Sequence, residues 1–227
     1  DVSTQTSAPI GIAFNSDGTK MFLSDKSDDD IDVYTLSTGF NLSTATFSGT
    51  SFDVEDQASS PQGIAFNNDG TKMFMIDNGG GADDVNEYTL SVGFDLASTV
   101  NHVDINSDGT GFSVGTQESN PTGIAFNNDG TKMFIVGTAG DDVNVYALST
   151  GFDTSTATFN DINGDGTGFD ISDQETVPRG ITFNDDGTKM FIVGDNGNDI
   201  NEYTLSVGFD LTSTVTHVGS FDVSDQE

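Results

Sequence analysis

The stretch "PQGIAFNNDGTKMF" (Pro61–Phe74) decides the fold, because the chain repeats it almost word for word. Related copies read "PIGIAFNSDGTKMF" from Pro9, "PTGIAFNNDGTKMF" from Pro121 and "PRGITFNDDGTKMF" from Pro178. Each copy contains one of the four prolines of the chain and is followed by one of its four tyrosines. A segment that recurs at intervals of 52, 60 and 57 residues (61 − 9, 121 − 61 and 178 − 121) predicts an array of similar structural units.

Each unit reads as four β-strands. "GIAFN" and "KMFIV" flank "NDGT", a tight hairpin signal in which Gly supplies a positive φ. A third strand, "VNEYTL" from Val85, is more polar, and a fourth ends at Phe52, Phe112, Phe169 or Phe221. Apolar content falls from the first two strands to the fourth, which is typical of a propeller blade with inner strands around an axis and an exposed outer strand. We therefore predict an all-β fold, a β-propeller of four blades with four antiparallel strands each, in which Pro-x-Gly crosses from one blade to the next.

The blade boundaries follow from the same repeat. We expect a single propeller domain over residues 1–227, with blades at about 6–58, 59–118, 119–175 and 176–227. Repeats 1 and 3 share "STGF" whereas repeats 2 and 4 share "SVGF", which predicts a doubled two-blade unit. The chain opens with "DVSTQ" and closes with "FDVSDQE", so the end of the fourth strand occurs about four and a half times. A closed four-blade ring is favoured; a cut from a longer array and eight blades from two chains are the alternatives.

The pattern "P-x-G-I-A-F-N-x-D-G-T-K-M-F-I-V" followed by "V-N-x-Y-x-L" resembles β-propeller repeats of the NHL and YVTN type. It is also similar to propeller repeats in large surface proteins and phage fibres of marine microbes. The resemblance covers essentially the whole chain and implies the propeller fold. It implies no single function, because propellers include enzymes, lectins, adhesins and scaffolds.

Composition excludes several classes of partner. The 37 acidic residues against 6 Lys and Arg give a formal net charge of −31, which disfavours binding to nucleic acid or to an anionic membrane surface. Metal cations are the natural counter-charge. The chain has no Cys and no apolar run of about 18 residues, so we expect neither disulfides nor membrane insertion. It opens at Asp1 without Met, as expected of a processed form or of a piece of a longer chain, and its acidity suits an extracellular place or a cell or virion surface.

Two segments have the pattern of the first half of a calcium loop. "DINSDG" from Asp104 and "DINGDG" from Asp161 place oxygen atoms at alternate positions, and the Gly allows a sharp turn around an ion. The candidate calcium ligands are Asp104, Asn106, Asp108 and the carbonyl of Thr110, and Asp161, Asn163, Asp165 and the carbonyl of Thr167. The twelfth position is Gly115 or Ser172 rather than Glu, so any site needs further ligands. A plain polar hairpin stays equally open.

The loop between the second and third strands is a further acidic candidate. In every repeat it ends in an Asp, namely Asp30, Asp84, Asp142 and Asp199. Four carboxylates around one axis could hold a cation at a channel mouth; the alternative is that each Asp bonds backbone N–H groups of its own turn. In the "NDGTK" turns, on the opposite face, we expect a local pairing of Asp with Lys.

The sequence offers few recognisable catalytic groups, since there is no Cys nucleophile and no Gly-x-Ser-x-Gly. Even the loops repeat one another, whereas an active site normally breaks the symmetry of its scaffold. We therefore predict that the chain is not an enzyme. The expected function is a non-catalytic extracellular propeller module, stabilised by calcium, that acts in surface adhesion or in recognition of a glycan or protein ligand. One alternative is a structural repeat unit of a self-assembling filament or fibre, with copies of itself as partners. Another is a glycosidase-like enzyme with two carboxylates.

Overall fold

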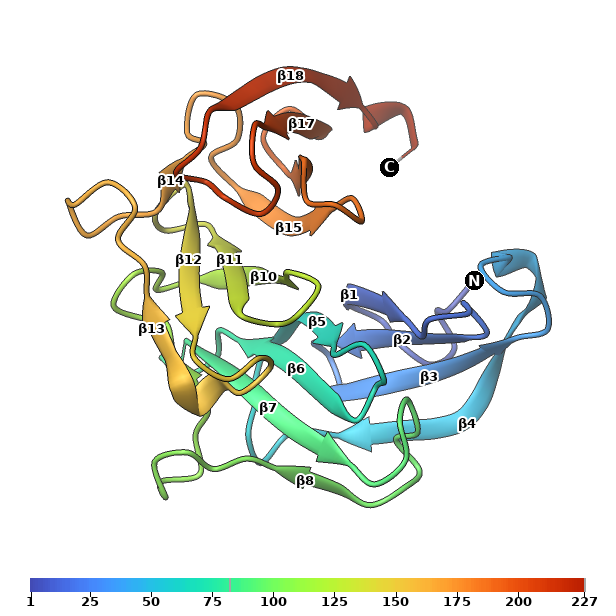
Figure 1. Ribbon diagram of the computed structural model, residues 1–227. Coiled ribbons are helices and arrows are strands. Elements are labelled where there is room, and N and C mark those ends of the chain that lie inside the picture. The colour runs from blue at the N-terminus through green and yellow to red at the C-terminus, as the bar shows by residue number, and fades with distance from the viewer. Residues whose placement is uncertain (82, 227) are drawn as a thin grey trace. The chain divides into compact units, whose positions relative to one another are not determined.

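The protein is described here by a computed structural model that covers residues 1–81 and 83–226 (Figure 1). Residues 82 and 227 lie outside this part, so the last position of the fourth predicted blade is not described. The chain has the predicted all-β fold, a β-propeller of four antiparallel blades in which successive strands pair in chain order. In the described residues no helix is long and apolar enough to cross a membrane.

The strands of the four blades have similar bounds in each repeat. Blade 1 contains β1 (Pro9–Phe14), β2 (Lys20–Asp25), β3 (Asp30–Leu36) and β4 (Ala45–Asp53). Blade 2 contains β5 (Pro61–Phe66), β6 (Lys72–Asp77), β7 (Asp84–Leu90), β8 (Val100–His102) and β9 (Phe112–Ser113). Blade 3 contains β10 (Pro121–Phe126), β11 (Lys132–Gly137), β12 (Asp142–Leu148), β13 (Ala157–Phe159) and β14 (Phe169–Asp170). Blade 4 contains β15 (Pro178–Phe183), β16 (Lys189–Gly194), β17 (Asp199–Leu205) and β18 (Val215–Asp222).

The two insertions with the DxNxDG pattern interrupt the fourth strand of their blades. In blades 1 and 4, which lack the insertion, this strand runs without a break as β4 and β18. In blades 2 and 3 it is divided into β8 and β9 and into β13 and β14, and both pieces pair with the third strand. Short 3-10 turns complete the secondary structure, at η1 (Leu42–Thr44), η2 (Thr154–Thr156) and η3 (Ser224–Gln226).

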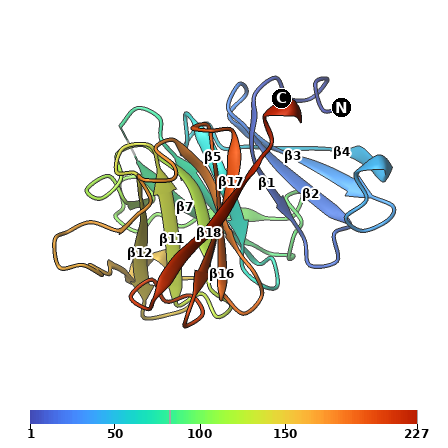
Figure 2. The same ribbon diagram turned by 90° about the horizontal axis from the view of Figure 1, so that it is seen from above.

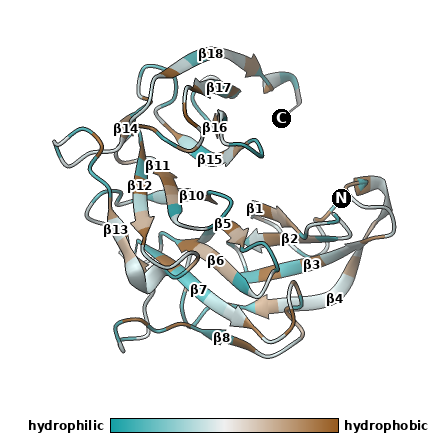
Figure 3. Cartoon of the chain, viewed as in Figure 1, coloured by the Kyte–Doolittle hydropathy of each residue, from teal (hydrophilic) through white to brown (hydrophobic). Residues whose placement is uncertain are grey.

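The chain divides into two compact units, Asp1–Ser113 with blades 1 and 2 and Val114–Glu227 with blades 3 and 4. Within each unit two blades pack face to face around one apolar core. Phe22 of β2 and Met73 of β6 belong to the first core, and Phe134 of β11 and Met190 of β16 to the second. Figure 2 shows the strands from above, and Figure 3 shows hydrophobic residues in brown on central strands such as β6 and β11.

One expectation about the strands is wrong. The Pro-x-Gly segment does not form the crossover but begins the first strand, where the register shifts between the proline and the following Gly-Ile. In blade 1 the first strand, β1, is largely exposed or half-buried, whereas β2 and β3 are mostly buried.

The long connection after the third strand folds back on the "NDGT" hairpin. Phe40 donates its backbone N–H to the carbonyl of Gly18 over 3.0 Å, and its ring covers the place where a Cβ of Gly18 would lie. Gly18 has φ of +70° and Phe40 has φ of +58°. This turn therefore requires Gly both for its backbone conformation and for the contact with the ring. The other three repeats have the same contact, made by Phe94, Phe152 and Phe209.

Candidate functional site

Carboxyl groups gather at one end of the blades, where the second strand ends and the third begins. In blade 1, Asp25, Asp30 and Asp53 stand in register across β2, β3 and β4. In blade 2, Asp77 of β6 pairs in the same way with Asp84 of β7. Residues paired across antiparallel strands point to the same face of a sheet, so each pair brings like charges together. Such a row favours protonation of at least one of its members.

The cluster in blade 1 has buried oxygen atoms without a hydrogen-bond partner. In the described part of the chain these atoms include one oxygen each of Asp25, Asp29, Asp30 and Asp32. The other oxygen of Asp32 accepts the hydroxyl of Ser51 over 2.5 Å. Burial, together with the charges of Asp32 and Asp25, raises the pKa of Asp30 to about 6. Asp30 is only half-buried, so it can exchange a proton with solvent near neutral pH.

Asp25 differs from its neighbours although it is fully buried. Burial raises its pKa, but the hydroxyl and the N–H of Ser27 both donate to Oδ1, at 2.7 and 2.8 Å, and the net shift is downward. Asp25 is therefore the member of the blade 1 cluster whose pKa is lowered, in contrast to Asp29, Asp30 and Asp32. Its negative charge contributes to the raised pKa of Asp29, after the larger effect of burial.

The predicted cation ring of Asp30, Asp84, Asp142 and Asp199 has one member at the start of the third strand in every blade. Asp142 accepts the amide of Asn144 over 2.6 Å and the N–H of Gly168 over 2.8 Å. Asp199 accepts the amide of Asn201 over 2.7 Å. These partners belong to the same blade, but two of them are side-chain amides and Gly168 lies in the insertion before β14, so these bonds are not the contacts within the turn that the backbone-bonding alternative describes.

Asp84 is buried, and burial together with nearby charges raises its pKa to about 6, although the N–H of Gly111 donates to it and lowers the pKa. These charges belong to Asp77, Asp108 and Asp83, all in blade 2. Asp30 and Asp84 lie in one compact unit, and Asp142 and Asp199 lie in the other. A shared cation at the four residues therefore stays a prediction.

The insertion loops use their carboxylates to hold their own backbone. Asp104 accepts the N–H of Asp108 over 3.1 Å, and Asp108 accepts the N–H and the hydroxyl of Thr110 at 3.1 and 2.7 Å. The Thr110 hydrogen bonds hold the pKa of Asp108 below its usual value. The side chain of Asn106 is exposed. This loop is a self-bonded turn of the kind that the hairpin alternative describes.

The second insertion has the same design. Asp161 accepts the N–H of Gly164 over 2.6 Å and that of Gly166 over 3.1 Å. The side chain of Asn163 donates to the carbonyl of Gly168 over 2.8 Å, and Asp165 accepts the N–H and hydroxyl of Thr167. Within residues 1–81 and 83–226 no three His, Cys, Asp or Glu side chains are placed to hold a metal ion. Calcium binding at the two loops stays a prediction that would require further ligands.

A set of buried carboxylates was missed from the sequence. Glu118 accepts the N–H groups of Asn120 and Ala139 at 2.7 and 3.1 Å, and thereby joins the residue before Pro121 to the turn after β11. In blade 2 the same task falls to Asp77, which accepts the N–H groups of Ser60 and Gly79 at 2.9 and 3.0 Å. Burial raises the pKa of both carboxyl groups.

The carboxylate has exchanged places between the repeats. Blades 1 and 2 end the second strand with Asp25 and Asp77, whereas blades 3 and 4 have Gly137 and Gly194 there. The latter two blades supply Glu118 and Glu175 instead, directly after the Gln of the preceding segment. A Cβ on Gly194 would collide with the carboxyl group of Glu175. The aligned repeats contain a signal for this exchange. Where the second strand ends in Asp, the Gln of the preceding segment is followed by Thr6 or Ala58, and where it ends in Gly, the Gln is followed by Glu.

The expected pairing of Asp with Lys inside the "NDGTK" turns is wrong. The turn Asp instead accepts the N–H and hydroxyl of the following Thr, as Asp17 does from Thr19 at 3.0 and 2.5 Å. The Lys side chains reach elsewhere. Lys20 and Lys132 donate to carbonyl oxygens of the next blade in their unit, those of Phe94 and Phe209, at 2.7 Å. Lys72 and Lys189 pair with Glu87 and Glu202 at 2.5 and 2.6 Å.

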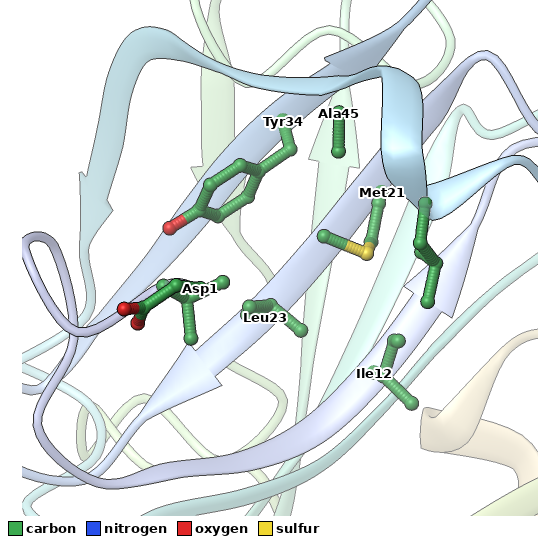
Figure 4. A pocket seen from close by; sticks show the side chains of 8 residues that line it. Asp1, Ile12, Met21, Leu23, Tyr34 and Ala45 are labelled. Atoms are coloured by element: carbon green, nitrogen blue, oxygen red, sulfur yellow. The ribbon is translucent and has the colours of Figure 1, made fainter. Parts of the chain in front are cut away.

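A cavity of about 260 Å³ lies on one face of blade 1 (Figure 4). Its lining is mainly apolar and consists of Asp1, Val2, Ile12, Met21, Leu23, Tyr34, Leu42 and Ala45. In Figure 4 the hydroxyl of Tyr34 and the carboxylate of Asp1 lie on the same side of it. Burial and the charges of Asp32, Asp25 and Asp30 raise the pKa of Tyr34, so its hydroxyl stays neutral above its usual range.

No protein-family model matches this chain. No curated protein matches it either. The similarity to NHL and YVTN repeats and to marine surface proteins therefore stays a prediction beyond the propeller fold itself.

Solved structures match over nearly the whole chain. A putative 6-phosphogluconolactonase from Bacteroides uniformis is 16% identical with a TM-score of 0.54, and the match covers 95% of this chain and 55% of that one. A functionally unknown protein from Desulfotomaculum acetoxidans is 15% identical with a TM-score of 0.56, covering 96% and 57%. The periplasmic gluconolactonase PpgL from Pseudomonas aeruginosa is 13% identical with a TM-score of 0.51, covering 95% and 54%. This chain thus spans little more than half the length of these proteins, and the likeness shows the propeller fold.

These comparisons correct the predicted function. A non-catalytic module for adhesion or ligand recognition was expected, but two of the three propellers named above are named as lactonases. The prediction rested on the absence of a Cys nucleophile and of Gly-x-Ser-x-Gly, and it gave no weight to carboxyl groups with a raised pKa such as that of Asp30. The expected surface location, and the expected glycan, protein or self partners, stay predictions.

Proposed function

We propose that the chain is part of a propeller hydrolase that opens small lactones or related esters, with Asp30 as the general base. The observation that carries the proposal is the carboxyl group of Asp30, which is half-buried, has a pKa of about 6 and has an oxygen without a hydrogen-bond partner. The names of matching propellers support the choice of substrate class. A base of this pKa is mostly ionised at pH 7 and still binds a proton readily.

The proposed reaction is a single addition of water. Asp30 takes a proton from a water molecule, and the hydroxide oxygen forms a bond to the lactone carbonyl carbon. The bond from that carbon to the ring oxygen then breaks. The ring oxygen takes the proton from Asp30 and leaves as a hydroxyl group, so the product is a hydroxy acid and Asp30 is restored. Asp32 assists by repelling negative charge on Asp30, which keeps its pKa high enough for this proton transfer.

The test is acid release from glucono-δ-lactone at constant pH, compared with a solution without protein. We expect the purified chain to exceed the spontaneous rate, and Asp30→Asn to lose that excess. Asp17→Asn, which changes an exposed turn carboxylate, is the matched control and should keep the excess. The excess rate should rise with pH around pH 6, since only the ionised form of Asp30 can act. Equal rates for the protein, for Asp30→Asn and for buffer would refute the proposal.

We also propose that the blades are of the NHL and YVTN type and that calcium occupies the insertion loops. The repeat pattern from Pro61 supports the first point. The Asp-x-Asn-x-Asp-Gly spacing from Asp104 and from Asp161, together with a net charge of −31, supports the second.

A further inference from the structure

Each blade has two faces that meet its neighbours differently. The trailing face of a blade, defined in blade 1 by Phe22, Ile31 and Val33, packs on the next blade of the chain. The leading face, defined in blade 2 by Met73, Met75 and Tyr88, receives the blade before it. The second unit repeats this junction, with Phe134, Val136, Val143 and Val145 of blade 3 against Met190, Ile192 and Tyr203 of blade 4.

Aromatic rings give the junction a fixed pattern. Phe22 of the trailing face lies 4.6 Å from Phe66 and 6.4 Å from Phe94 of the next blade, measured between ring centroids. The second unit repeats these distances with Phe134, Phe183 and Phe209. A second contact is an edge-on pair between the last Phe of the trailing face and the Tyr of the leading face. It joins Phe52 to Tyr88 and Phe169 to Tyr203, at 5.7 and 6.3 Å.

The leading face of blade 1 carries its half of this pattern. The rings of Phe14 and Phe40 are tilted against each other with centroids 5.4 Å apart, as those of Phe66 and Phe94 are at 5.3 Å, yet 61% of Phe40 is exposed. Ile12 of this face is exposed as well. The apolar cavity in Figure 4 lies on this same face.

The trailing face of blade 4 carries the other half. Phe191 takes the place of Phe22, and Phe221 takes the place of Phe52 at the end of the fourth strand. Phe221 is 70% exposed, and Val193, which lies across Ile200 from it in the sheet, is 40% exposed. In blade 3 the corresponding Phe134 and Val136 are fully buried within their unit, which shows that a face of this composition suits burial.

We propose that the trailing face of blade 4 docks on the leading face of blade 1 of a second copy of this chain. Phe191 then joins Phe14 and Phe40, and Phe221 meets Tyr34 edge-on. Lys189 Nζ leaves Glu202 for the carbonyl of Phe40, as Lys20 and Lys132 bind the next Phe carbonyl in their units.

A second copy is the occupant because of ring size. The chain matches 54 to 57% of the length of three solved propellers, so two copies supply the length of one such ring. Two equal head-to-tail junctions close under a twofold axis and give eight blades. Asp30 begins β3, four residues before Tyr34 on the same face, and none of the contacts named above involves it, so this inference does not rest on the proposed hydrolysis.

The test is the mass of the 227-residue chain in solution by light scattering or native mass spectrometry. We expect twice the chain mass of 23.8 kDa, and we expect Phe221→Glu with Val193→Glu to give the single-chain mass with an unchanged circular dichroism spectrum. Val92→Glu, a change at an exposed Val of blade 2 that makes none of the proposed contacts, should stay dimeric. A wild-type monomer, or a ladder of larger assemblies, would overturn the inference.

Cross-linking identifies the surfaces, since the chain contains no Cys. A mixture of Phe221→Cys and Ile12→Cys chains, treated with a short bismaleimide, should give a covalent dimer of one chain of each kind. The double variant should cross-link between chains rather than within one. A covalent link confined to single chains would mean that blade 4 meets blade 1 of its own chain, and would overturn the proposal.

Discussion

Glu175 offers the sharpest test of how a blade is fastened to the segment before it. This buried carboxylate accepts the N–H of Val177 over 2.7 Å and that of Asn196 over 3.1 Å. Glu175→Ala removes both bonds and leaves two backbone donors without their partner. An unsatisfied buried donor costs about 1–3 kcal/mol, and so we expect a loss of roughly 3 kcal/mol in unfolding free energy. For a chain of this size the loss corresponds to a fall in Tm of about 6–12 °C.

A second substitution, Gly194→Asp, should restore these two hydrogen bonds from the end of β16. The three atoms nearest to a Cβ at Gly194 all belong to the side chain of Glu175, and Gly194 is not in the left-handed region. Gly194→Asp alone should therefore destabilise, because it crowds a second carboxyl group against Glu175. Combined with Glu175→Ala, it recreates the arrangement of Asp77, whose Oδ1 accepts the two equivalent N–H groups. The double variant should come within about 1 kcal/mol of the wild type, a coupling that independent sites do not show.

The assay is a double-mutant cycle by urea unfolding at pH 7. Asp195→Ala serves as the control, because Asp195 pairs with Arg179 at an exposed position where ion pairs contribute about 0–1 kcal/mol. If the losses of Glu175→Ala and Gly194→Asp simply add in the double variant, the two positions do not share one function and the reasoning fails.

Two further predictions concern metal and pH. If the insertion loops bind calcium, adding calcium should raise the Tm of the wild type by several degrees, and Asp104→Ala with Asp161→Ala should abolish the gain; a gain that survives in this variant would exclude the loops as the site. Burial raises the pKa of Asp30 from 3.8 to about 6 in the folded state, so the folded chain binds more protons there than the unfolded chain between those values. Stability from this group is full below about pH 4 and is lost as pH rises through 6. Asp30→Asn should therefore gain stability relative to the wild type on going from pH 4 to pH 7.5, as measured by urea midpoints; a constant difference would show that the folded pKa of Asp30 is not raised.

The blade architecture could be predicted because its determinants are local and repeated. Asp69 and Gly70 fix the hairpin between two apolar runs, and this signal occurs four times. The position of the insertions was likewise predictable, since repeats 1 and 4 lack them. The role of Pro61 could not be read in the same way, because a proline at a strand start and one in a crossover look alike in sequence.

The candidate site was less accessible to prediction because it depends on burial. The sequence pointed to the start of the third strand as a candidate, yet Asp30 and Asp142 differ in their hydrogen-bond partners rather than in their sequence pattern. Glu118 and Glu175 were passed over in a chain with 37 acidic residues, where one more Glu carries little information. Only their buried position, against a Gly on another strand, separates them from solvated surface charges.

The exchange between Asp on the second strand and Glu on the incoming segment limits how such chains can recombine. A blade cut at Pro178 takes Gly194 with it but leaves Glu175 behind. If this blade were joined to an incoming segment with Ala at the position of Ala58, it would have no carboxylate to accept the N–H groups at its start. The reverse graft, a blade with Asp77 behind a Glu, would place two carboxylates in one buried position. A recombining unit that keeps its buried carboxylate therefore begins before the glutamine of the incoming segment. This start lies several residues ahead of the first strand of the blade.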